Sequence, residues 1–172
     1  TTGPVFDENE RASWFSHKAE IATPYYYRVY LAEHDVVAEI APTERAAAFR
    51  LTYPEKDASY LVIDAYQHGS YVKVIPEKNM VIGYATNNHG GVPENFRNWF
   101  VIVSDTPFET FSVIDGDNVA EGNEVAADHA LAMVGFRTKR GQEVNLKVAS
   151  SFISAEQAEL NLRELDGKSF DD

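Results

Sequence analysis

The feature that most constrains this chain is a series of short segments in which apolar and polar residues alternate. Turn residues such as Gly, Pro, Asn and Asp separate these segments, and no long helical pattern interrupts them before residue 150. Many short strands without crossover helices predict an all-β domain, an antiparallel sandwich or barrel. The expected strands are residues 25–32, 36–41, 46–53, 59–66, 71–75, 80–86, 96–104, 108–114, 130–137 and 144–150.

One helix is expected, at residues 154–165. Ser154 and Gln157 have the spacing of a capping box, in which the Gln side chain reaches back to the cap. Gly167 stands where a left-handed residue would end the helix. One face carries an apolar stripe formed by Ala158, Leu162 and Leu165. An all-β domain offers this helix no obvious surface, so we expect weak packing, with removal costing only about 1 kcal/mol.

This pattern predicts an irregular segment at 1–14, a β-sandwich at 15–152 and a linker helix at 153–172 that leads to a missing domain. With 172 residues the chain has room for about one domain. Its 27 acidic and 15 basic residues give a net charge of −12, which disfavours nucleic acid and anionic membranes as partners. It has no cysteine, so disulfides, zinc–thiolate sites and cysteine nucleophiles are excluded. No segment has the length of a membrane span.

Acid–base chemistry has only weak support in the sequence. Four carboxylates lie in or beside apolar strands, where partial burial could raise a pKa: Glu20, Glu39, Glu44 and Asp64. Pairing with a nearby Arg, or capping of a turn, is the favoured interpretation of all four. His17 and Glu20 could share a metal, but two candidate ligands are a weak signal. We therefore predict neither catalytic nor metal-binding residues in this chain.

Residues 87–99 form the most site-like loop. Asn87, Asn88 and His89 offer hydrogen-bonding groups, and Phe96 and Trp99 offer flat rings, a combination suited to a sugar. The favoured alternative is a mobile hairpin loop with Phe96 and Trp99 in the core. The second tryptophan, in an irregular segment, is an interdomain contact or a core residue. The candidate sugar-binding residues are Asn87, Asn88, His89, Trp99 and Trp14.

Four segments together resemble glycoside hydrolase family 92, and they span most of residues 15–165. They are FSHKAEIATPYYY (15–27), AEIAPTER (38–45), FRNWFVI (96–102) with the following Pro107-Phe108, and SFISAEQAELNLRE (151–164). The resemblance implies calcium-dependent, inverting exo-α-mannosidases that act on mannose-containing glycans. It also implies an N-terminal, supersandwich-like β-sandwich, a helical linker and a C-terminal (α/α)6 barrel.

In that family the general acid, the general base and the calcium ligands lie mainly in the barrel. This chain would then support the barrel of the same polypeptide, line part of the mannoside pocket, bind no cofactor itself and be inactive alone. The family also suggests a periplasmic, cell-surface or secreted location, which the sequence itself leaves undetermined.

The chain departs from the family pattern in several places. The family's Gly-rich opening, and the aromatic stretch after it, have no match upstream of Phe15. Tyr25 stands where Gly is common, and Pro42 where Thr is common. No catalytic residue is therefore carried over. The alternatives are an autonomous carbohydrate-binding module and a surface interaction domain. A binding module should expose rings in a coplanar row, whereas a supporting domain should expose an apolar patch along the linker helix.

Overall fold

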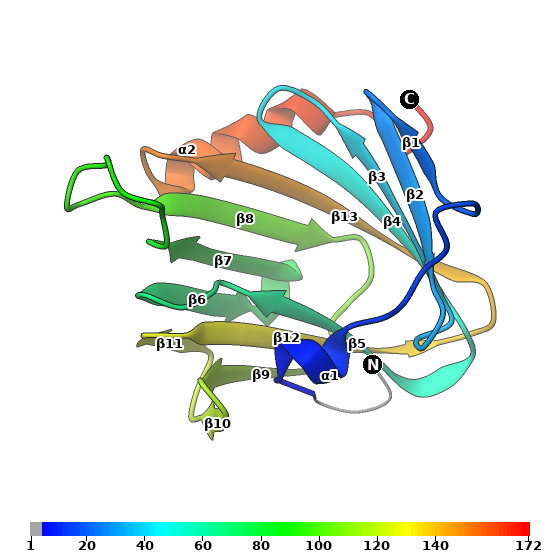
Figure 1. Cartoon of the computed structure of the whole chain (residues 1–172), viewed down its shortest axis with the longest axis horizontal. Helices are drawn as coiled ribbons and strands as arrows, with labels where there is room; N and C mark the ends of the chain where they lie inside the picture. The colour runs from blue at the N-terminus through cyan, green and yellow to red at the C-terminus, as the bar shows by residue number, and fades with distance from the viewer. Residues whose placement is uncertain (1–4) are drawn as a thin grey trace.

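A computed structural model describes residues 5–172, which form two antiparallel β-sheets packed face to face (Figure 1). The larger sheet has nine strands in the order β1-β2-β3-β4-β13-β8-β7-β6-β11. The smaller sheet has four strands in the order β10-β9-β12-β5. The prediction of an all-β, antiparallel sandwich is confirmed.

The strands of the larger sheet are β1 (Ile21–Thr23), β2 (Tyr26–Leu31), β3 (Val36–Pro42), β4 (Ala46–Tyr53), β6 (Ser70–Ile75), β7 (Met80–Ala85), β8 (Asn98–Ser104), β11 (Glu124–Ala127) and β13 (Gln142–Ser151). Those of the smaller sheet are β5 (Lys56–Asp64), β9 (Thr110–Asp115), β10 (Asn118–Ala120) and β12 (Ala130–Thr138). The helices are α1 (Glu8–Arg11), η1 (Pro76–Lys78), α2 (Ala155–Asn161) and η2 (Leu162–Leu165).

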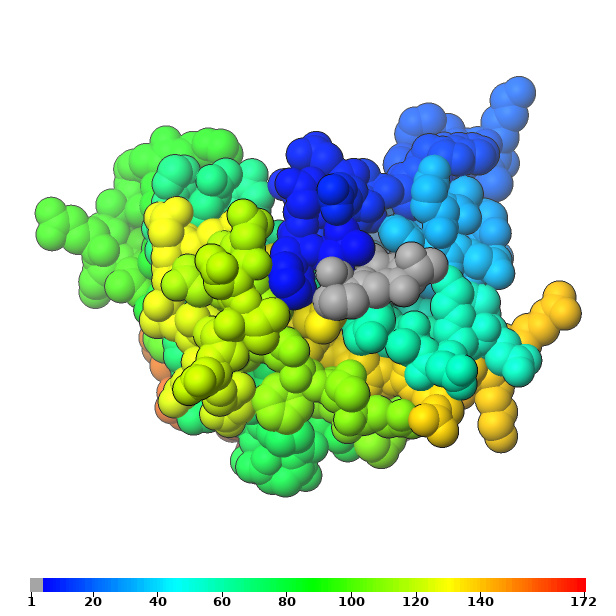
Figure 2. Space-filling view, turned by 90° about the horizontal axis from the view of Figure 1, so that it is seen from below, coloured from blue at the N-terminus to red at the C-terminus, as the bar shows by residue number. Residues whose placement is uncertain are grey.

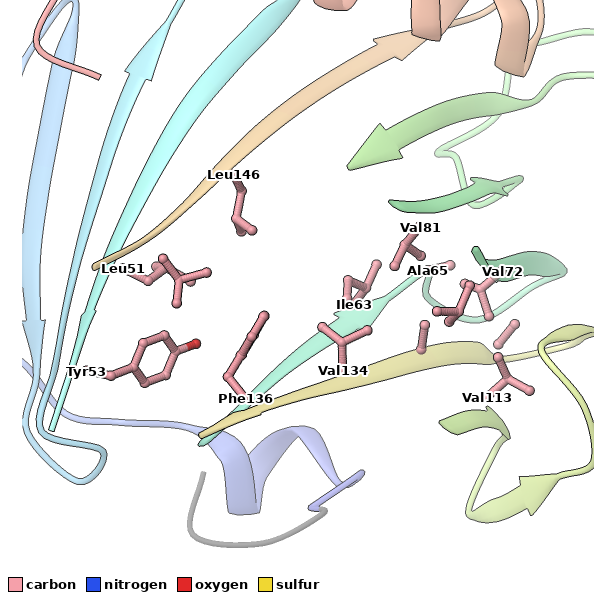
Figure 3. Packing of buried hydrophobic residues seen from close by; sticks show 14 of the residues in the cluster. Leu51, Tyr53, Ile63, Ala65, Val72, Val81, Val113, Val134, Phe136 and Leu146 are labelled. Atoms are coloured by element: carbon pink, nitrogen blue, oxygen red, sulfur yellow. The ribbon is translucent and has the colours of Figure 1, made fainter. Parts of the chain in front are cut away.

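The core lies between the two sheets (Figure 3). Phe136 and Val134 of β12 point toward Tyr53 and Leu146 of the larger sheet. Val134 is fully buried and Phe136 nearly so. Because alternate side chains of a strand point to opposite faces, the sequence alternation places one apolar set in this layer.

The long strands agree with the expected ones to within a few residues, but three short ones were not predicted. These are β1, β10 and β11, of three or four residues each. Such segments are too short for alternation to stand out, and all of β1 is exposed. The segment predicted to be irregular, 1–14, also contains the one-turn helix α1. The Asp7 side chain caps the N-terminus of α1 by accepting a hydrogen bond from the Asn9 amide at 2.9 Å.

The helix signals at the C-terminus are largely confirmed. The Ser154 hydroxyl accepts a hydrogen bond from the Gln157 amide at 3.1 Å, and Gly167 is left-handed with φ +69°. The reciprocal half of the capping box is wrong. The Gln157 side chain instead donates to Asn161 Oδ1 at 3.1 Å, because Asn161 is held one turn later by its own bond to the Ser150 carbonyl.

The expectation that this helix has no surface to pack on is also wrong. α2 crosses the outer face of the larger sheet over β13 and β8, and η2 continues over β13 and β4 (Figure 1). Ala158 is fully buried against Met80 and Val101, and Leu165 is buried beside Ala149. The larger sheet therefore has apolar cover on both faces along these strands.

The N-terminal segment covers part of the outer face of the smaller sheet, as α2 and η2 cover the outer face of the larger one. Phe6 packs on Ile114, Leu131 and Met133, which point away from the sandwich core. Figure 2 shows this segment lying across the surface beside the strands of the smaller sheet. An ion pair between Arg11 and the Asp64 carboxylate, at 2.6 Å, fixes α1 to the end of β5.

Candidate functional site

The loop between β7 and β8, residues 86–97, projects from one end of the larger sheet (Figure 1). Its tip turns at Gly90, whose φ of +96° suits a residue without a side chain. The Asn88 Oδ1 accepts the Gly90 amide at 2.7 Å, and Thr86 Oγ1 donates to the Gly69 carbonyl at 2.6 Å. These bonds set the shape of the loop and tie its base to a neighbouring turn.

The three polar residues predicted in this loop differ in what they can offer a ligand. The Asn87 Nδ2 donates to the Gln67 carbonyl at 3.1 Å, and the Asn88 Nδ2 donates to the Thr86 carbonyl at 2.9 Å. Both amide nitrogens therefore hold the loop itself. His89 is exposed at the tip. Asn87 Oδ1 makes no hydrogen bond within the described part of the chain, so it remains available as an acceptor.

A shallow hollow of about 340 Å³ lies between this loop and the turn before β6. Its lining residues are His68, Thr86, Asn87, Asn88, Val92, Pro93, Glu94 and Phe96. The hollow combines an aromatic ring with a few polar groups, as ligand sites do. Sequence reasoning missed His68. The His68-Gly69 pair marks a turn, but the turn reaches the loop only through the pairing of β6 with β7.

Trp99 lies elsewhere, on the outer face of β8. Its ring meets the Tyr84 ring at 4.8 Å in an edge-on contact, and Tyr84 stacks on Tyr71 at 5.6 Å. The Arg97 guanidinium lies 5.0 Å from the centre of the Tyr84 ring. Trp99 is half-buried and belongs neither to the hollow nor to the sandwich core, so the interpretation of Trp99 as a core residue is wrong. The rings form a cross-strand row that packs against itself.

Trp14 is separate again, beside the turn between β2 and β3. It is 66% exposed, so it is not a core residue. Its backbone amide donates to Glu33 Oε2 at 2.8 Å, and its carbonyl accepts from the Ala32 amide at 3.4 Å. The structure does not bring Trp14 to the hollow.

The candidate carboxylates are all engaged by partners. Hydrogen bonds from Arg50, at 2.9 and 3.0 Å, lower the pKa of Glu39. Hydrogen bonds from His17 and Tyr27 lower the pKa of Glu20. Glu44 is exposed and lies 3.5 Å from the guanidinium of its neighbour in sequence.

Asp64 lies at the end of β5 and is half-buried. Burial raises its pKa, but hydrogen bonds from His129, the Tyr66 amide and Arg11 outweigh that effect, so the pKa lies below its ordinary value. A general acid needs a raised pKa. Asp64 is therefore a structural carboxylate, as are Glu20 and Glu39.

Within residues 5–172, no group of three or more His, Cys, Asp or Glu side chains is placed to hold a metal ion. His17 Nδ1 and Glu20 Oε1 do meet, at 2.8 Å, but as an isolated pair. Of the helices described, none combines the length and apolar character needed to cross a membrane.

Two exposed apolar side chains immediately precede α2, and we call Phe152 and Ile153 the helix patch. Phe152 is 72% exposed and Ile153 77%. The Phe152 ring contacts the Phe96 ring at 5.6 Å, and Phe96 also lines the hollow. The helix patch and the hollow are thus adjacent.

Comparison with known proteins gives the family. A model of the glycosyl hydrolase family 92 N-terminal domain matches residues 1–151. The chain belongs to this family. Its fold matches a family 92 inverting mannosidase from Bacteroides thetaiotaomicron VPI-5482 with a TM-score of 0.89 and 36% identity, covering 97% of this chain and 23% of that one.

A family 92 α-mannosidase from Bacteroides thetaiotaomicron, solved with mannoimidazole, matches with a TM-score of 0.84 and 29% identity, over 92% of this chain and 22% of that one. A third family 92 hydrolase, 24% identical with a TM-score of 0.77, supports the fold. This family 92 domain thus spans less than a quarter of the enzymes it resembles. No match was found among curated proteins.

Proposed function

We propose that this domain is the N-terminal β-sandwich of a calcium-dependent, inverting exo-α-mannosidase. It supports a C-terminal (α/α)6 barrel in the same polypeptide and lines part of the mannoside pocket. The two mannosidases that match over more than nine-tenths of this chain support the assignment. More than three-quarters of each of those enzymes lies outside the matched region, which leaves ample chain for a catalytic domain.

The observation that carries the supporting role is the helix patch. Phe152 and Ile153 are consecutive, and each is more than 70% exposed, which is costly for a surface that stays in water. They lead directly into α2, which packs on β13 and β8, and η2 and Phe170 after it also contact the larger sheet. Burial against a second domain of the same polypeptide would remove these two side chains from water. Phe96 then connects that interface to the hollow.

The binding-module alternative has less support from the rings. Tyr71, Tyr84 and Trp99 are half-buried; Tyr71 stacks on Tyr84, whereas Trp99 meets Tyr84 edge-on. The three rings are therefore not the coplanar row that a binding module should expose.

The domain alone is proposed to be catalytically inert. Inversion needs two carboxyl groups about 6.5–9.5 Å apart, one of which has a raised pKa. Glu20, Glu39 and Asp64 have lowered pKa values instead. Within residues 5–172, no three His, Cys, Asp or Glu side chains come together as candidate metal ligands. The acid, the base and the calcium ligands are assigned to the barrel.

The test is reassembly of the enzyme from two pieces. The 172-residue chain is mixed with the remainder of its parent polypeptide, and mannose release from an aryl α-mannoside is measured with and without calcium. We expect activity only from the mixture with calcium, and first-formed product of inverted anomeric configuration. Activity from this chain alone, or from the remainder at an undiminished level, contradicts the proposal.

A pair of variants locates the interface. Phe152→Ser with Ile153→Ser should reduce reassembly at least tenfold, because each lost apolar contact is worth about 1.5–3 kcal/mol. Val119→Ser is the matched control, because Val119 is 61% exposed but lies in β10 of the other sheet. It should reassemble as well as the unmodified chain. Equal loss in both would show that the helix patch is not the interface.

A further inference from the structure

The turn between β5 and β6 concentrates unusual backbone conformations. Tyr66 has φ +67° and His68 has φ +74°, and Gly69 follows at +96°. Left-handed conformations suit Gly, whereas a residue with a Cβ is disfavoured there, and Tyr more so than His. Such positions persist when the surroundings over-determine them, and they cluster at binding sites.

Hydrogen bonds from three directions hold this turn. The Tyr66 amide donates to Asp64 Oδ1 at 2.9 Å, and Ser70 Oγ donates to the Tyr66 carbonyl at 2.7 Å. Thr86 Oγ1 donates to the carbonyls of His68 and Gly69. The Gln67 carbonyl also accepts a hydrogen bond, from Asn87 Nδ2. The backbone is therefore fixed by its neighbours, whichever side chains the turn carries.

The two left-handed side chains differ in what they contact. The Tyr66 ring lies edge-on to His129 at 6.4 Å, and His129 donates to Asp64 at 2.7 Å, so Tyr66 has a packing role. The exposed imidazole of His68 makes no hydrogen bond or ring contact within the described part of the chain. It lines the hollow, with Asn87 on the neighbouring loop.

We propose that His68 is a sugar-binding residue, held by the strained turn so that its imidazole bonds a hydroxyl of an uncharged sugar ring in the hollow. The imidazole can both donate and accept. Asn87 Oδ1 and the Glu94 carboxylate supply acceptors for further hydroxyls, and the Phe96 ring faces the C–H surface of the sugar. Glu94 and the net charge of −12 oppose an anionic ligand.

The choice of a mannoside as the sugar rests on the proposed function, but the binding itself needs no second domain. The 172-residue chain is titrated with methyl α-mannoside up to about 100 mM, well above a millimolar dissociation constant. Amide chemical shifts of Gly69 and Asn87 and the ring shifts of His68 report the hollow. We expect saturable changes at these positions and none at Trp14.

Glycine substitutions separate binding from folding. His68→Gly and Tyr66→Gly both remove a side chain from a left-handed position, so each should keep the melting temperature within about 4 °C of the parent value or raise it. His68→Gly should weaken mannoside binding about three- to tenfold, the loss of one hydrogen bond. Tyr66→Gly should leave binding unchanged. His68→Asn, which tolerates the left-handed region and keeps a donor and an acceptor, should restore part of the binding.

The assignment is overturned if the unmodified chain shows no shift changes at about 100 mM sugar, if a folded His68→Gly variant binds as before, or if Tyr66→Gly weakens binding equally. A chain that binds galactosides but not mannosides would retain the site and remove the link to the mannosidase function. Failure of the two-piece reassembly leaves this titration unaffected, so the two proposals fail independently.

Discussion

Both ends of the described chain cover the outer face of a sheet, but they do so by different means. At the C-terminal end, α2 and η2 bury Ala158 and Leu165 on the larger sheet. At the N-terminal end, the smaller sheet is covered mainly by one side chain, Phe6, while an ion pair between Arg11 and Asp64 fixes the segment. One cover is chiefly apolar and the other depends on charge.

The polar contacts of the two covers sharpen this difference. Around η2, the Glu164 carboxylate accepts from Thr43 at 2.6 Å and from the Arg45 amide at 3.1 Å, and Lys147 donates to the Leu165 carbonyl at 2.7 Å. These bonds add to an apolar contact that exists without them. A cover fixed by charge should respond to pH, whereas a cover fixed by burial should respond to changes in side-chain volume.

The largest effect is expected from removing the apolar cover altogether. Ending the chain after Ser151 would expose Met80, Val101 and Ala149 and discard the buried side chains of α2 and η2. At about 1.5–3 kcal/mol for each large buried side chain, the free energy of unfolding should fall by at least about 3 kcal/mol. Urea denaturation measures it. A loss near 1 kcal/mol would restore the expectation from sequence that the helix packs weakly.

A smaller effect is expected from trimming one side chain of that cover. Leu165 is 4% exposed, and Leu165→Ala should cost about 2–3 kcal/mol because it leaves a cavity beside Ala149. Leu160→Ala, on the exposed side of α2, is the matched control and should change stability by less than about 0.5 kcal/mol. Thermal and urea unfolding of the pair would show whether burial or helix propensity stabilises this end. Equal costs would point to propensity.

The charged cover should respond to pH. Because the pKa of Asp64 is lowered in the folded chain, its contribution to stability is present above the unfolded-state pKa of about 3.9 and is lost as pH falls through the folded value. Asp64→Asn should therefore cost about 1.5–3 kcal/mol at pH 7, and this cost should shrink below about pH 4. Asp57→Asn, an exposed position on the same strand, is the control. If the cost of Asp64→Asn does not vary with pH, the ion pair does not stabilise this end of the chain.

Local features of this fold could be predicted from the sequence, whereas contacts between distant segments could not. The cap at Ser154 and the left-handed Gly167 follow from neighbouring residues, and so do the long strands. The Arg11–Asp64 pair joins residues 53 apart, and His68 meets the loop at 86–97 only because β6 and β7 pair. No local pattern specifies such encounters.

One distant contact did leave a signal. Residues 80–82 (Met-Val-Ile) and 99–103 (Trp-Phe-Val-Ile-Val) are apolar without alternation, which is typical of strands buried on both faces. This continuity indicates that something covers the outer face of β7 and β8. The amphipathic helix at 154–165 was the available candidate, so its packing could have been inferred from the two patterns together.

The smallest effect on stability is expected at the helix patch, although it lies at the start of the same apolar cover. Phe152 and Ile153 are more than 70% exposed, so folding removes little of their surface from water. The double change to Ser should alter the free energy of unfolding by less than about 1 kcal/mol, including the lost ring contact with Phe96. Urea denaturation of the 172-residue chain gives this number, with Val119→Ser on the other sheet as the reference. A loss above about 2 kcal/mol would show that these side chains stabilise this domain itself, and their exposure would then no longer argue for a partner.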